Sequence, residues 1–162
     1  MKIRLTPAVV LAVLLAAPAW AQPQDRLLRG LSEASVNVSH NWTEADARCG
    51  IREADVKAIV AKTAGDGGLK VADTPDLAEL LVSFVTIETE GECISHARVA
   101  LRGMATATLL YDPQKEPKGM PVVLREESTL FLSPASQHGA RFQDRVRGLV
   151  ERIAAAVKAE NQ

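Results

Sequence analysis

Three histidines, two cysteines and a few carboxylates are the side chains in this sequence that could carry out catalysis or bind a metal. The histidines, His40, His96 and His138, lie far apart, and no pair has the i, i+3 or i, i+4 spacing of a helical zinc site. Ligands that are distant in sequence can still meet in the fold. If the turn around Gly91 is three residues long, Glu88 falls beside His96, and His40 could join them in a small hydrolase or metal site.

Motifs of other catalytic and cofactor-binding sites are missing from the sequence. There is no Gly-x-Ser-x-Gly, no Cys-x-x-Cys and no phosphate-binding glycine loop. The composition also argues against a nucleic-acid partner, because 19 Lys and Arg face 20 Asp and Glu and only 4% of residues are aromatic. We therefore expect no cofactor, no bound nucleic acid and a function that is not catalytic.

The first residues have the pattern of a secretory signal peptide. Lys2 and Arg4 precede a stretch of about 13 mostly apolar residues, too short for the roughly 20 that span a bilayer. Ala19-Trp20-Ala21 then matches the small-x-small site of a signal peptidase. The pattern predicts a signal peptide over residues 1–21 and one domain over 22–162. We expect a soluble periplasmic or secreted protein with no transmembrane segment after cleavage near Ala21.

Both cysteines lie in the predicted mature chain. An even number of cysteines in an oxidising compartment favours a disulfide between Cys49 and Cys93. Closing a loop of about 45 residues would add roughly 4 kcal/mol to the free energy of unfolding.

The spacing of apolar residues predicts two amphipathic helices. One covers 51–64, with acidic residues in its first turn and glycines after its end. The other begins near Ala140 and continues to the last residues, with Ser136 as a candidate cap before it. Its apolar stripe contains Phe142, Val146, Leu149, Val150, Ile153 and Val157.

The remaining apolar segments alternate with the period of two that is typical of strands. We predict strands over 35–43, 69–71, 77–90, 94–111 and 122–133. The strands 77–90 and 94–111 form a hairpin, and the pattern leaves two registers possible that differ by one residue. The fold class is then α+β, a single antiparallel-rich sheet of 4–5 strands with two helices on one face, in the order β-α-β-β-β-β-α.

The sheet face away from the helices is the predicted binding surface. It would present polar and basic side chains, namely Asn37, Ser39, Asn41, Arg98 and Arg102. The last helix adds a basic face with Arg141, Arg145, Arg147 and Arg152.

The main hypothesis is a non-catalytic exported protein that binds another envelope component, or a second copy of itself, through the sheet face or the basic last helix. The alternatives are the hydrolase or metal site at His40, His96 and Glu88, and an inhibitor of a secreted enzyme that acts through the proline-rich loop 112–121.

Overall fold

The computed structural model describes residues 28–73, 78–107 and 118–162, and within these it shows five strands and three helices. The predicted signal peptide and most of the proline-rich loop lie outside the described residues. The elements follow in the order β1 Glu33–Val38, α1 Glu44–Arg48, α2 Glu53–Asp66, β2 Lys70–Val71, β3 Ala78–Thr89, β4 Glu92–Ala107, β5 Lys118–Pro134 and α3 Ala135–Glu160.

The five strands form one sheet in the order β2-β1-β3-β4-β5. β1 runs parallel to β2 and β3, whereas β3, β4 and β5 form an antiparallel meander. The predicted α+β class with an antiparallel-rich sheet is therefore confirmed. The parallel placement of β1 and the short helix α1 were not expected. The predicted strand 35–43 also ends early, because β1 stops at Val38 and residues 39–43 form the loop before α1.

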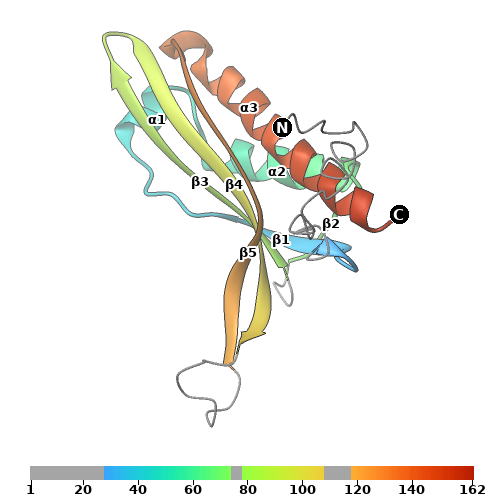
Figure 1. The fold of residues 1–162 in the computed structure, drawn as a ribbon. Coiled ribbons are helices and arrows are strands. Elements are labelled where there is room, and N and C mark those ends of the chain that lie inside the picture. Colours follow the sequence, from blue (N-terminus) through green and yellow to red (C-terminus); the bar gives the residue numbers. More distant parts are fainter. Residues whose placement is uncertain (1–27, 74–77, 108–117) are drawn as a thin grey trace, which may run out of the picture.

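The helices lie on one side of the sheet, which we call the inner face, and the opposite side is the outer face (Figure 1). β4 and β5 continue past the last β3 pair, Ala78 with Gly103, and project as a two-stranded arm that Figure 1 shows below the rest of the sheet. Among the described residues no helix is long and apolar enough to cross a membrane.

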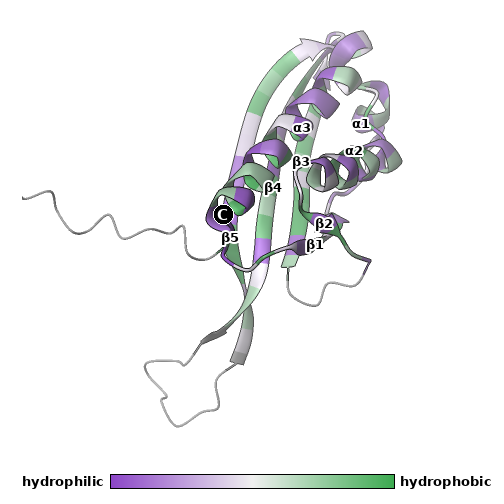
Figure 2. Ribbon diagram, turned by 90° about the vertical axis from the view of Figure 1, so that its right-hand side faces the viewer, coloured by the Kyte–Doolittle hydropathy of each residue, from purple (hydrophilic) through white to green (hydrophobic). Residues whose placement is uncertain are grey.

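The two long helices are amphipathic, and Figure 2 shows hydrophilic and hydrophobic residues alternating along them. α3 packs on α2, β4 and β5. Every residue of its predicted apolar stripe is buried, so that prediction is confirmed. The helix begins at Ala135, five residues before the predicted start, and its N-cap is Pro134 without a side-chain hydrogen bond, so the proposed cap at Ser136 was wrong. Burial of this stripe against the strands supplies the main apolar core.

The β3–β4 turn has two residues, and this decides which side chains share a face. Glu90 and Gly91 both have positive φ, 50° and 82°. A two-residue turn with this geometry matches the right-handed twist of the flanking strands. The register consequently pairs Glu88 with Cys93 and Val85 with His96. The three-residue turn considered from the sequence would have shifted the register by one residue and exchanged the two faces of one strand.

A disulfide between Cys49 and Cys93 links the segment before α2 to the hairpin end of β4. The bond predicted from the sequence is therefore present, and both cysteines are fully buried. Beside it, the first turn of α3 lies against the loop after α1: a methyl group on Gly139 would overlap the carbonyl of Gly50. The Ala135 N–H also donates to the Gly91 carbonyl, 2.9 Å away. Three segments distant in sequence are thus fixed together at the hairpin end.

Replacing Cys49 with Ser should lower the free energy of unfolding by roughly 2–5 kcal/mol, because the unfolded chain loses its cross-link. Urea unfolding followed by circular dichroism measures the change. Cys93→Ser should cost the same, and the double variant no more than either single one. Two free thiols in the unfolded, unreduced protein would show that the bond does not form.

Gly139→Ala should destabilise the protein by about 1–3 kcal/mol, because the added methyl group meets backbone that cannot move independently. Gly148→Ala is the matched control in the same helix. Its nearest neighbour would be an Arg152 nitrogen at 3.7 Å, so alanine should stabilise the helix by up to about 1 kcal/mol. Equal effects of the two substitutions on the thermal midpoint would refute the close approach of α3 to Gly50.

Candidate functional site

His138 belongs to a chain of polar groups buried between α3 and the inner face. Its Nε2 lies 2.8 Å from Ser95 Oγ and its Nδ1 lies 2.8 Å from Ser133 Oγ. Ser95 Oγ also lies 2.8 Å from Thr86 Oγ1. A neutral imidazole has one donor and one acceptor nitrogen, and hydroxyl groups satisfy both. Burial lowers the pKa of His138, which favours this neutral form.

The Ser95–His138 pair has the spacing of a nucleophile and its base, but its surroundings differ from those of an active site. Both side chains are 0% exposed, and the ring of Phe131 stacks on the imidazole. A substrate therefore has no access to the serine, and the role of the network is structural. Two features of the sequence indicate this buried network. Serines occupy inward positions of the strands, and His138 lies four residues before Phe142 on the apolar stripe of the last helix.

His40 forms a second polar cluster, with Asp46 and Thr43 at the start of α1. Its Nε2 donates to Asp46 Oδ2 at 2.8 Å, and the same oxygen accepts from the Thr43 N–H and hydroxyl. Burial raises the pKa of Asp46, but the hydrogen bonds from His40 and Thr43 outweigh this and hold the pKa below its ordinary value. The imidazole stacks on Phe84 with a centroid distance of 3.8 Å. These contacts fix the loop between β1 and α1.

The predicted group of His40, His96 and Glu88 does not come together. Glu88 pairs with the buried Cys93 and binds Arg48 of α1, which places it on the inner side. His96 is exposed on the outer face, because it lies three residues after Cys93 in β4 and successive side chains of a strand point to opposite faces. Glu88 and His96 lie on opposite faces because the β3–β4 turn has two residues and this length sets the register of the hairpin. No cluster of three metal-ligating side chains occurs among the described residues.

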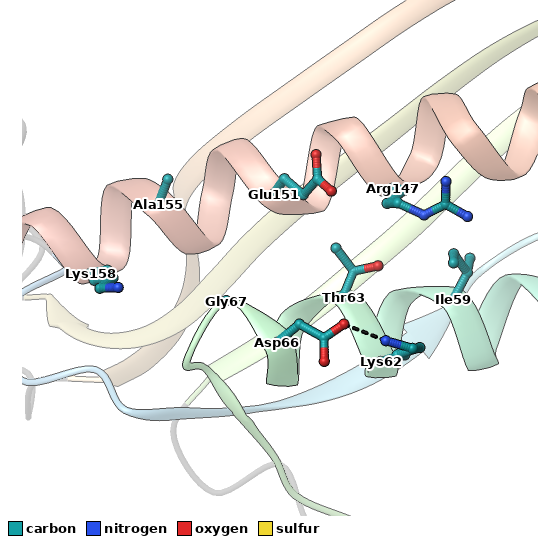
Figure 3. Close-up of a pocket in the computed structure, with 9 residues that line it drawn as sticks. All are labelled: Ile59, Lys62, Thr63, Asp66, Gly67, Arg147, Glu151, Ala155 and Lys158. Carbon is teal, nitrogen blue, oxygen red and sulfur yellow. Dashed lines mark hydrogen bonds and ion pairs between the residues drawn. The ribbon is translucent and has the colours of Figure 1, made fainter.

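A cleft of about 570 Å³ separates α2 and α3 on the helical side of the molecule. Figure 3 shows that its rim carries both charges, with Lys62 bound to Asp66 on α2, and Arg147 and Glu151 on α3. Neither histidine nor cysteine lines it. The charged side chains and the apolar Ile59 that line the cleft do not form a recognisable catalytic group, so this cleft is a weaker candidate than the sheet.

The outer face carries three of the five residues predicted for the binding surface. Asn37 donates to Glu79 Oε1 at 2.7 Å, and Glu79 pairs across β3 and β4 with Arg102. Arg98 forms an ion pair with Glu126 of β5. Ser39 and Asn41 are exposed but follow β1 in the loop before α1, so they flank the face rather than belong to a strand.

The hairpin end of this face is apolar, which differs from the polar face predicted from the sequence. Cross-strand pairing creates two rows, Val85–His96–Leu130 and Ile87–Ile94–Leu132. We call these six residues the outer patch. Four of its aliphatic side chains are largely exposed, at 61% for Val85, 57% for Ile87, 70% for Leu130 and 52% for Leu132. The signal for this patch is that β3 and β5 are apolar at both alternating positions near the hairpin.

Comparisons with known proteins leave the family open. No family model and no curated protein matches the chain. Among solved structures, a variant of PelC from Paraburkholderia phytofirmans, described as a dodecamer, has 13% identity and a TM-score of 0.45 over 80% of this chain and 87% of that one. A minor lipoprotein from Acinetobacter baumannii has 10% identity and a TM-score of 0.35 over 82% and 91%. Similarities at this level identify neither the function nor the partner of this chain.

The basic side of α3 is neutralised locally. Arg147 pairs with Asp144, and Arg152 pairs with Glu127 of β5. The hydrogen bonds from Arg152 and Arg125 lower the pKa of Glu127 and keep it ionised. Arg141 and Arg145 are exposed. Because two of its four arginines already have carboxylate partners, α3 offers less free positive charge than its sequence indicated.

The buried His138 predicts that stability falls on acidification from about pH 6.5. Its pKa is lowered in the folded state, so below 6.5 the unfolded chain binds more protons, and the free energy of unfolding drops by up to about 1.4 kcal/mol per pH unit. The pKa of Asp46 is also lowered in the folded state, so protonation of this carboxylate reduces the free energy of unfolding only below about pH 4.

Urea unfolding between pH 7.5 and pH 5 measures this slope. His138→Gln should reduce both the stability at neutral pH and the slope. His96→Gln is the comparison variant, because it removes a histidine that is exposed and lies outside the buried network. An equal slope in His138→Gln and in the unsubstituted protein would rule out His138 as its source.

Proposed function

We propose that this chain is an exported, non-catalytic protein that binds a protein of the cell envelope through the outer face of its sheet. One observation carries the proposal: large apolar side chains on three adjacent strands are exposed on the face that no described helix covers. Soluble proteins seldom expose a contiguous apolar surface unless something binds to it. Polar groups beside it, including Arg98 and Arg102, would form the rim of such an interface.

Two features support export. The N-terminal sequence has the pattern of a signal peptide, and the Cys49–Cys93 disulfide is a bond that persists in oxidising compartments. Together these two features support a periplasmic or secreted location. Residues 22–162 would then form the mature protein.

The geometry favours the sheet face over the other surfaces considered from the sequence. The arginines of α3 are partly paired, and His96 and Glu88 lie on opposite sides of the sheet. The buried Ser95–His138 pair is closed to substrates. The proline-rich loop lies mostly outside the described residues, so its use as an inhibitory segment stays a prediction from the sequence.

Crosslinking of the tagged, exported protein in living cells, followed by mass spectrometry, tests this function. Arg98→Glu combined with Arg102→Glu should abolish capture of the envelope protein, because it reverses two charges at the rim. Arg141→Glu combined with Arg145→Glu makes the same change on exposed positions of α3 and should leave capture intact.

Thermal unfolding by circular dichroism establishes that both double variants are folded. Capture that is equal in both variants would contradict a binding role for the outer face. Loss of capture only in the α3 variant would move the binding surface to the helix.

A further inference from the structure

β5 is the last strand of the sheet, and among the described residues no strand lies beside its outer edge. Every second residue of an edge strand directs its N–H and C=O groups away from the sheet, where another extended chain can pair with them. The chain turns back directly after Pro134, so the start of α3 lies beside this strand (Figure 1). An extended peptide can add to a free strand edge of this kind as a further strand.

A hollow of about 310 Å³ lies between this strand and the helix, and we call it the edge groove. It is lined by Phe131 and Leu132 of β5 and by Arg141, Asp144 and Arg145 of α3. Successive side chains of a strand point to opposite faces, so a hollow that touches both Phe131 and Leu132 lies at the edge of the sheet. Phe131 is half-buried and Leu132 is 52% exposed. The edge groove therefore offers apolar contacts beside the free main-chain groups.

The arginines of α3 show which charge the edge groove lacks. Arg141, Arg145 and Arg152 lie on one stripe of the helix, because they are separated by about one and two turns. Arg152 crosses to β5, where its Nε donates to Glu127 Oε2 at 2.9 Å. At the level of the other two arginines the strand presents Phe131 and no carboxylate. A ligand with carboxylates would complete the pattern that Arg152 and Glu127 begin.

Arg141 and Arg145 are exposed, and neither has a carboxylate partner among the described residues. Arg141 donates to the amide oxygen of Gln137 at 3.3 Å. Asp144, the acidic residue in the lining, is paired with Arg147. Like charges four residues apart on a helix repel each other, so an anion between the two arginines is stabilising. The edge groove is thus complementary to acidic side chains.

The spacing of the two arginines sets the spacing of the acidic residues that fit them. Four residues of helix correspond to about 6 Å along the axis. Alternate residues of a strand lie on the same face and are about 6.6–6.8 Å apart. An added strand with an acidic residue at every second position can therefore place one carboxylate near each arginine. Its intervening side chains lie on the other face, beside the exposed Leu130 and Leu132, where apolar residues fit.

We infer that the edge groove binds an extended peptide segment in which acidic and apolar residues alternate, and that this segment pairs with the free edge of β5 as an additional strand. Main-chain hydrogen bonds supply affinity, and the two arginines select for acidic side chains. An anionic lipid headgroup can also bind two arginines, but it has no main-chain groups to offer β5. The edge groove is separate from Arg98 and Arg102, so the inference goes beyond the proposed function.

Fluorescence anisotropy tests the inference with the exported protein and a labelled seven-residue peptide of alternating valine and glutamate, capped at both ends. Arg141→Glu combined with Arg145→Glu should raise the dissociation constant at least tenfold, equivalent to about 1.4 kcal/mol. Lys62→Glu combined with Lys158→Glu is the matched control. It makes the same change of charge at exposed positions of the cleft between α2 and α3 and should leave peptide binding unchanged. Circular dichroism establishes that both double variants are folded.

Two methylated forms of the peptide test the strand pairing without any change in the protein. Methyl groups on alternate backbone nitrogens block one edge of the peptide, and moving them by one residue blocks the other edge. Only one edge of the bound peptide faces β5, so one form should lose binding and the other should retain it. The unmethylated peptide should also slow amide hydrogen exchange at residues 128–132.

Four results would overturn the inference. The peptide could fail to bind at concentrations up to about 1 mM. Equal affinity of the two methylated forms would show that no strand is added. Equal affinity of the arginine double variant and the unsubstituted protein would place binding outside the edge groove. A protein that ignores the peptide but binds phosphatidylglycerol vesicles through Arg141 and Arg145 would identify the edge groove as a membrane contact. None of these results changes the expected capture of an envelope protein at the outer face, so the proposed function is tested separately.

Discussion

The disulfide between Cys49 and Cys93 holds the hairpin end of the sheet to the segment that leads into α2, and the arrangement of the inner face depends on this junction. Cys93 pairs with Ser133 in the sheet, and Ser133 in turn binds His138 at the start of α3. A covalent bond, a ladder pair and a buried hydrogen bond therefore join β4, β5, α3 and the α1–α2 loop within a few residues. The absence of a side chain at Gly139 allows the helix to approach this point.

The two faces of the sheet have different consequences for the protein. The inner face is filled by apolar side chains, and its few polar groups, such as Ser95, have hydrogen-bond partners. The outer face leaves Leu130 and its neighbours in contact with water, an arrangement that lowers solubility unless a partner covers it. The burial of polar groups on one side and the exposure of apolar groups on the other both follow from the single register of the β3–β4 hairpin.

Much of the fold could be predicted because its signals are local. The stripe from Phe142 to Val157 predicts α3, and two cysteines in a chain that begins with the pattern of a signal peptide predict their bond. The turn was harder, because Glu90 is not a residue that usually adopts positive φ, and the register follows from that conformation. The parallel pairing of β1 and the bonds of His138 join residues far apart in the chain, which no local pattern reveals. The outer patch has no local signal either, because its aliphatic positions on β3, β4 and β5 become neighbours only through the register of the three strands.

α3 follows all five strands in chain order, although it covers the inner face and supplies a partner for both Ser95 and Ser133. As a chain is synthesised or exported from its N-terminus, the strands emerge first and their apolar sides have no helix to pack on. Until the residues from Ala135 onward emerge, the nascent sheet exposes hydrophobic surface on both faces. The period of greatest risk for aggregation therefore ends only when the last helix arrives.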